Sequence, residues 1–137
     1  MILYFAEGVR MPKIRKRDIS AWIGSVAGKH GFRTGDVSYI FCSDEHILKM
    51  NREYLRHDYY TDIITFDYTA ENRISGDIFI SLDTVSSNAE KFGVSYGDEL
   101  HRVIIHGILH LCGINDKTPE ERAVMKKCED EALNHFK

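Results

Sequence analysis

The chain has 137 residues, 43% of them hydrophobic and 28% charged, and its formal net charge at pH 7 is −3. These values are ordinary for one soluble globular domain that folds without staples, and the apolar runs are far too short to span a membrane. The three cysteines have no paired spacing, which indicates a reducing compartment and argues against a disulfide framework.

The first half of the chain predicts two strands and two helices in alternation. β-forming residues from Met1 to Glu7 indicate the first strand, and apolar residues at helical spacing indicate a helix with Asp18 as its N-cap. A turn at Gly35-Asp36 leads to a strand over residues 37–42. Ser43 then caps a helix. The apolar residues expected to face the sheet from that helix are Ile47, Leu48, Met50 and Tyr54.

The second half predicts short buried strands over residues 63–66 and 76–81, followed by helices over 82–92 and 96–111. The capping box Thr118-Pro119-Glu120-Glu121 begins a terminal helix. This order predicts an α+β fold. We expect a single domain with about four strands in one mixed sheet, about five helices covering it, and the 96–111 helix across one face.

A pair of histidines lies inside the helix expected over residues 96–111. On a helix, His106 and His110 sit one turn apart on the same face, so both imidazoles can reach one metal ion. Gly113 can adopt a positive φ, end the helix and reverse the chain, which can bring Asp116 back as a third ligand. Two histidines and a carboxylate leave a coordination position open for water, as in catalytic zinc sites. The sequence therefore predicts a hydrolytic metal site.

Other readings of these residues stay open. Histidine pairs at this spacing also occur by chance, and Asp116 could cap the following turn and leave the metal to water. The zincin motif H-E-x-x-H shares only the ligand geometry, because Gly107 stands where those peptidases have their glutamate base. Cys112 points away from the histidine face and is expected to be a buried thiol.

The same stretch resembles a known family. His106 to Asp116 is similar to H-G-x-L-H-L-x-G-x-D-H, the signature of YbeY-type proteins, which are metal-dependent single-strand endoribonucleases of ribosomal RNA maturation and ribosome quality control. Asn51 to Phe66 resembles a second family block, N-x-x-Y-R-x-K-D-x-P-T-[DN]-V-L-S-F, and Gly76-Asp77-Ile78 resembles a third. The chain departs from the family pattern at Asp116, where a histidine is usual, and at Leu55, where the family has an arginine.

The resemblance implies one YbeY-like metal-hydrolase domain over residues 1–137. It implies a cytoplasmic endoribonuclease with one zinc ion, or another divalent transition metal, on His106, His110 and Asp116. The implied partners are single-stranded ribosomal RNA and the small ribosomal subunit, with no membrane. We expect Arg56, next to the departing Leu55, to reach substrate phosphate from the same cleft as the histidines. Asp62 stands at the [DN] position of the second block and is expected to hold a neighbouring loop, while the general base is not evident.

Arg102 is the second candidate for neutralising phosphate charge. It stands one helical turn before His106 on the same face. Its other reading is a surface cation paired with Glu99. A run of cations earlier in the chain is either a solvated segment or a phosphate-contacting patch, and the net charge by itself does not indicate a nucleic-acid binder. This run consists of Arg10, Lys13, Arg15, Lys16 and Arg17.

Two other classes of function remain as alternatives. A metal-dependent hydrolase of another small or peptide-like substrate would be favoured by an enlarged apolar pocket beside the ion. A non-enzymatic ribosome-assembly module would use the metal for structure. Structural zinc sites normally have four protein ligands, and no fourth is close by in the sequence.

Overall fold

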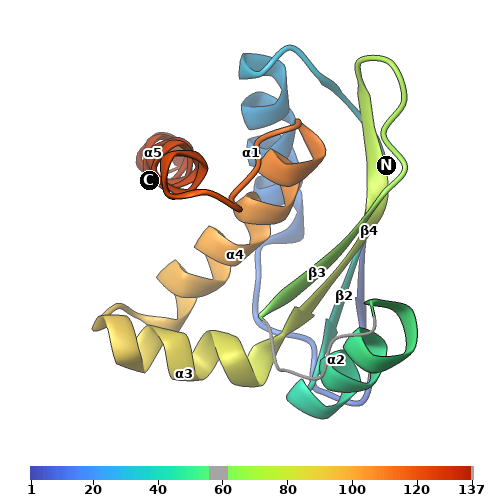
Figure 1. The fold of residues 1–137 in the computed structure, drawn as a ribbon, viewed down its shortest axis with the longest axis vertical. Helices are drawn as coiled ribbons and strands as arrows, with labels where there is room; N and C mark the ends of the chain where they lie inside the picture. The colour runs from blue at the N-terminus through green and yellow to red at the C-terminus, as the bar shows by residue number, and fades with distance from the viewer. Residues whose placement is uncertain (56–61, 137) are drawn as a thin grey trace.

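The computed structural model describes residues 1–55 and 62–136, and its centre is a four-stranded sheet (Figure 1). The strands are β1 (Ile2–Ala6), β2 (Arg33–Cys42), β3 (Ile63–Asp67) and β4 (Arg73–Ser81), in the spatial order β1-β2-β4-β3. β1 and β4 run parallel to β2, while β3 is antiparallel to β4. The predicted α+β fold with one mixed sheet is confirmed.

Five α-helices accompany the sheet within the described residues. They are α1 (Lys16–Lys29), α2 (Asp44–Met50), α3 (Leu82–Phe92), α4 (Tyr96–Leu111) and α5 (Pro119–Phe136). α2 continues into a π-helical turn, η1 (Asn51–Leu55). α1 and α4 lie on one side of the sheet and α5 lies outside them (Figure 1). Within the described residues, no helix is long and apolar enough to cross a bilayer.

The two faces of the sheet are covered differently. Along β4, Ile78 and Ile80 belong to the large core under α1 and α4, whereas Phe79 between them packs with the smaller cluster under α2. This follows from the alternation of side chains along a strand. Ile47 and Met50 of α2 are buried in that smaller cluster, as predicted. α2 therefore lies on the face opposite to α4.

α4 approaches the sheet closely at one glycine. A Cβ atom at Gly107 would lie 3.0 Å from Cδ1 of Ile78 and 3.2 Å from Cδ1 of Ile63. The hydroxyl of Tyr39 on β2 donates a hydrogen bond to the Ile104 carbonyl at 2.8 Å. A side chain at position 107 would therefore require Ile78 and Ile63 to shift by a few tenths of an ångström, which favours the glycine found there.

α5 is fastened to the first helix as well as to α4. Nε1 of Trp22 on α1 donates to the buried Ala132 carbonyl at 2.9 Å, and its ring stacks on Phe136 with centroids 4.3 Å apart. Thr118 and Glu121 form the predicted capping box, each backbone N–H donating to the other side chain. The start of α5 is thus fixed directly after the loop that carries Asp116.

Most predicted boundaries are confirmed, including both ends of α3 and α4. α1 begins at Lys16, so Asp18 lies in its first turn and is not the N-cap. Residues 35–36 lie inside β2, at an irregularity in its register with β4, and form no separating turn. A Cβ atom on Gly35 would lie 2.5 Å from the Ile74 carbonyl, which explains the glycine by close strand approach.

Tyr54, expected to face the sheet, is 65% exposed. The helix widens into the π-helical turn after Met50, so the spacing of side chains departs from the regular α-helical period.

Candidate metal centre

His106, His110 and Asp116 come together at the C-terminal end of α4, as predicted. Gly113 has a φ of 89°, and its N–H donates to the His110 carbonyl at 2.9 Å. The Ile114 N–H donates to the Leu109 carbonyl at 3.0 Å. These bonds close the helix and turn the chain back, so that the Asp116 carboxylate faces both imidazoles.

The distances among these three side chains fit one metal ion. Oδ2 of Asp116 lies 3.3 Å from Nε2 of His106 and 3.4 Å from Nε2 of His110. One potential ligand atom from each residue lies within 4.8 Å of the others. Tetrahedral zinc with bonds of about 2.0–2.1 Å separates neighbouring ligand atoms by roughly 3.3–3.4 Å. The residues present could therefore hold an ion with little movement.

Glu129 of α5 supports the first of the two imidazoles from behind. Its Oε2 lies 2.6 Å from Nδ1 of His106. An ionised carboxylate can only accept a hydrogen bond, so this contact favours a proton on Nδ1. In the neutral imidazole the Nε2 lone pair then faces Asp116. The other oxygen of Glu129 accepts from Nη1 of Arg102 at 2.7 Å. Such outer carboxylates orient metal-binding histidines and increase their basicity.

The charges around the two histidines affect their pKa values in opposite directions. Burial lowers the pKa of His106, but the hydrogen bond and charge of Glu129, with the charges of Asp116 and Asp62, raise it above its ordinary value. Burial and the nearby charge of His106 lower the pKa of His110, against the opposing effect of Asp116. The pair thus contains one more basic and one less basic imidazole.

Arg102 lies beside this site but is bound to carboxylates of α5. Nη1 pairs with Glu129, and Nη2 donates to Oδ1 of Asp130 at 2.9 Å. These partners lie on another helix, whereas the alternative considered from the sequence was a pair with Glu99 on the same helix. The Arg102 side chain remains 31% exposed. Its expected contact with phosphate stays a prediction.

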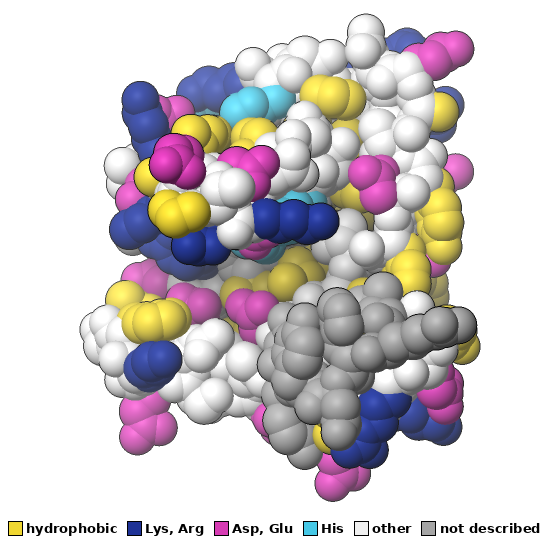
Figure 2. Space-filling model, in the orientation of Figure 1, with side chains coloured by type: hydrophobic (Ala, Val, Ile, Leu, Met, Phe, Trp, Pro, Cys, Tyr) yellow, Lys and Arg dark blue, Asp and Glu magenta, His cyan; other side chains and the backbone are white. Residues whose placement is uncertain are grey.

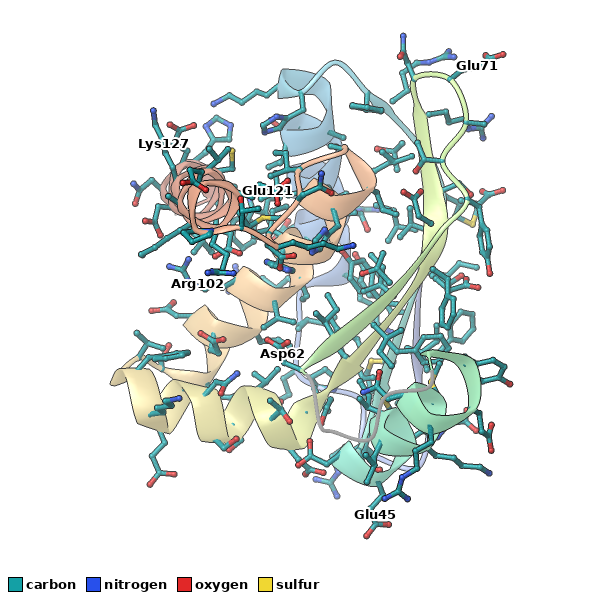
Figure 3. The ribbon with its side chains drawn as sticks, viewed as in Figure 1. Glu45, Asp62, Glu71, Arg102, Glu121 and Lys127 are labelled. Carbon is teal, nitrogen blue, oxygen red and sulfur yellow. The ribbon has the colours of Figure 1, made fainter. Side chains whose placement is uncertain are left out.

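The remaining predicted residues divide into described and undescribed ones. Arg56 lies outside the described residues. Asp62 is described and lies directly before β3 (Figure 3). Burial raises the pKa of Glu99, the charge of Arg102 opposes this rise and the charge of Asp62 adds to it. The charge of Asp62 also helps to raise the pKa of His106, so it acts on the metal centre.

Cys112 is half-buried and packs against the main core, where burial raises the pKa of its thiol to about 11. The potential metal-binding group found among the described residues does not include it. The basic segment of residues 10–17 is exposed at each of its five cations.

Sequence reasoning missed Glu129. A signal for it exists, because Met125, Glu129 and Ala132 are spaced at helical intervals and form the buried face of α5. A glutamate in an apolar stripe is rarely buried unless it is paired. The identity of its partner, however, depends on how α5 packs on α4.

Comparison with solved structures supports this description of the fold. A solution structure of a Thermotoga maritima protein matches with a TM-score of 0.67 and 29% sequence identity, covering 99% of this chain and 91% of that one. The fold and the site together define a small α+β protein with a candidate metal centre on a helix that crosses a mixed sheet.

Sequence comparison then assigns the family. The family model described as Endoribonuclease YbeY matches residues 9–137. A curated Endoribonuclease YbeY from Bacteroides thetaiotaomicron is 64% identical over 132 residues, which cover 96% of each chain. Another, from Porphyromonas gingivalis strain ATCC 33277, is 55% identical, over 96% of this chain and 87% of that protein. The chain belongs to the endoribonuclease YbeY family, and this membership supports an endoribonuclease role.

Proposed function

We propose that the chain is a metal-dependent endoribonuclease that cleaves single-stranded RNA, with its residues forming one metal-hydrolase domain. His106, His110 and Asp116 would hold one ion, zinc first and manganese or iron as alternatives. The observation that carries this proposal is the convergence of the three ligand atoms, with Asp116 at 3.3 and 3.4 Å from the two Nε2 atoms, in a member of an endoribonuclease family.

A bound zinc-type ion lowers the pKa of its water toward neutrality and polarises a phosphoryl oxygen. The protein supplies the arrangement around that chemistry. Glu129 keeps the proton of His106 on Nδ1, so that Nε2 is free to bind. Arg102 lines the same cleft as His106, and we propose that its exposed edge and Arg56 balance the charge of the substrate phosphate.

In the cell, we propose that the substrate is ribosomal RNA and that the protein acts with the small ribosomal subunit in RNA maturation and ribosome quality control, in the cytoplasm. This proposal rests on the family resemblance alone. It predicts that cells without the protein accumulate unprocessed small-subunit ribosomal RNA. Normal RNA ends in such cells would contradict it.

A hydrolase of another small or peptide-like substrate is the second candidate, because apolar side chains line the cleft beside His106: Phe92, Val94 and Met125. Three cations line the same cleft, namely Arg102, Arg122 and Lys126. Cations at this density favour a phosphate-bearing substrate.

The proposal is tested by metal analysis of the purified protein and by cleavage of matched single-stranded and duplex RNA. We expect about one ion per chain, cleavage of the single strand only, loss of cleavage with a chelator and recovery with zinc or manganese. Asp116→Ala serves as the site-disrupted control. Cleavage that survives complete removal of metal, or equal cleavage of the duplex, would contradict the proposal.

A further inference from the structure

A cleft of about 490 Å³ opens beside His106, between α5 and the turn that joins α3 to α4. Its volume is within the roughly 300–1,000 Å³ typical of small-molecule sites. Figure 2 shows a hollow across this face of the molecule, with Lys and Arg side chains along its α5 rim. The metal ligands Asp116 and His110 do not line this cleft, so it adjoins the metal centre from the His106 side.

The α3–α4 side of the cleft presents two apolar side chains to solvent. Phe92 is 58% exposed and Val94 is 43% exposed. Gly93 between them has a φ of 68°, and the Val94 N–H donates to the Ala89 carbonyl at 3.0 Å. Because this helix end is hydrogen-bonded and the next helix starts at once with a Ser95 cap, the two side chains are held at a fixed turn. The fold therefore keeps both side chains exposed to solvent.

The α5 side of the cleft presents two cations one helical turn apart. Arg122 and Lys126 are both exposed on α5, and a spacing of four residues places them on the same side of a helix. Nη1 of Arg122 donates to the Lys117 carbonyl at 2.8 Å. Because this carbonyl is uncharged, the bond does not neutralise the positive charge of Arg122. Nζ of Lys126 lies 3.3 Å from Oδ2 of Asp130 in an exposed pair, and such pairs contribute little and exchange easily.

Two carboxylates also line the cleft, but neither is directed to the rim. Glu129 is held between His106 and Arg102. Glu99 is 4% exposed and lies in the floor with Met125, which is 2% exposed. The cleft therefore combines a buried, partly apolar floor, an exposed aromatic ring on one side and exposed cations on the other. This arrangement is complementary to a nucleotide, whose flat base can stack on the ring and whose negative phosphate can lie beside the cations. Proteins bind unpaired nucleotides in this way.

We propose that this cleft binds one unpaired nucleotide of the RNA strand, next to the phosphate that is cut, with the base against Phe92 and the backbone phosphate beside Arg122 and Lys126. The inference rests on the proposed function and deepens it. The bases of a duplex are stacked on one another and cannot stack on Phe92. Binding in this cleft would therefore explain why the protein prefers single-stranded RNA to duplex RNA. A peptide is the other occupant with an apolar side chain, but a neutral peptide would bring no negative charge to Arg122 and Lys126.

The test is binding of short fluorescent RNA oligonucleotides to the full-length protein in the presence of EDTA, so that no cleavage occurs. One oligonucleotide carries bases and the other is the abasic form of the same backbone. We expect the wild-type protein to bind the base-bearing strand about tenfold more tightly, in line with the usual effect of one stacked base. Phe92→Ala should bind both strands equally. Tyr68→Ala removes an aromatic ring that is 61% exposed outside the cleft and serves as its matched control.

The cations are tested with the same two strands. Arg122→Gln and Lys126→Gln should each weaken binding of the base-bearing and the abasic strand to the same extent, because a phosphate contact does not depend on the base. Each should also reduce the salt dependence of binding. Lys127→Gln is the matched control, since Lys127 lies on the outer side of α5, away from Arg102 (Figure 3). Thermal unfolding of each variant confirms that it is folded.

The inference is overturned if the wild-type protein binds the two strands equally or not at all, if Phe92→Ala keeps the preference for bases, or if Lys127→Gln acts like Lys126→Gln. Cleavage is measured separately. Expected binding without RNA cleavage would support nucleotide binding in the cleft and contradict the proposed function. Cleavage without the expected binding would support the proposed function and contradict nucleotide binding in the cleft.

Discussion

The two sides of α4 are built in different ways. The side toward the sheet is apolar, with Ile104 and Ile108 fully buried, and it fits the strands through the missing side chain of Gly107. The side toward α5 carries Arg102 and His106, which are partly exposed and bonded to carboxylates. The first side depends on shape, and the second depends on charges brought from elsewhere in the chain.

This difference separates stability from chemistry along one helix. Changes on the sheet side should alter the free energy of unfolding and leave the metal centre intact. Changes on the α5 side should alter metal binding with little effect on unfolding. The following predictions test that separation, from the largest expected effect to the smallest.

Asp116→Ala should weaken metal binding by about a hundredfold. A ligand should matter at least as much as an outer-shell partner, whose loss costs about 10- to 100-fold. Titration against a competing chelator measures the affinity. Asp116→His should retain the metal and move the pH profile of activity lower, because a site with neutral ligands leaves more positive charge on the ion and a lower pKa on its water. Unchanged affinity in the alanine variant would remove Asp116 from the site.

Gly107→Val should destabilise the protein by about 2 kcal/mol, since overpacking a core costs roughly 1–3 kcal/mol. Its Cβ atom would lie 3.0 Å from Ile78 before the two methyl groups are added. Urea unfolding measures the change. Metal affinity of the folded variant should stay close to that of the wild-type protein. A large loss of affinity at full stability would show that the two sides of α4 are not independent.

Glu129→Gln should weaken metal binding about tenfold at pH 8, because the hydrogen bond to Nδ1 of His106 loses its charge. The pH dependence gives a second measurement. Protons compete with the metal for Nε2, and in the wild-type protein the charge of Glu129 helps to raise the pKa of His106. Affinity should therefore begin to fall at a higher pH in the wild-type protein than in the variant, so that the difference between them shrinks on acidification. A constant ratio from pH 8 to pH 5.5 would show that Glu129 acts only through packing.

Gly97→Ala should stabilise the protein by about 0.5 kcal/mol. Gly97 lies in the first turn of the same helix, and an added Cβ atom there would meet no other atom within 4 Å. The comparison with Gly107 thus separates the helix preference of alanine from the contact with the sheet. Destabilisation at Gly97, measured by urea unfolding, would mean that the backbone there resists an added side chain.

What the sequence could predict follows the same division. The end of α3 and the start of α4 lie at local signals, Gly93 and the Ser95 cap, and both boundaries were predicted from the sequence. His106 and His110 share a helix turn, so their meeting is also local. Asp116 reaches the two histidines through one chain reversal at Gly113, and the glycine itself indicated that reversal.

The parts that the sequence did not predict depend on contacts between distant segments. Glu129 meets His106 across 23 residues because α5 packs on α4. Gly35 was read as a turn because a glycine required by a neighbouring strand looks the same in the sequence as a glycine required by a turn. The ion pairs of Arg102 with Glu129 and Asp130 also depend on the packing of α5 on α4.

The hydrogen bond from Trp22 to Ala132 has a consequence for the order of events during synthesis. The two residues are separated by 110 positions, and a ribosome adding about 5–20 residues per second needs roughly 5–20 s to make the intervening chain. Until then α1 lacks the helix that covers its indole ring, and His106 lacks the carboxylate that holds its proton. His106, His110 and Asp116 are all made before Glu129 of α5 is in place behind His106. We therefore expect the metal centre to reach its full affinity only after α5 has docked.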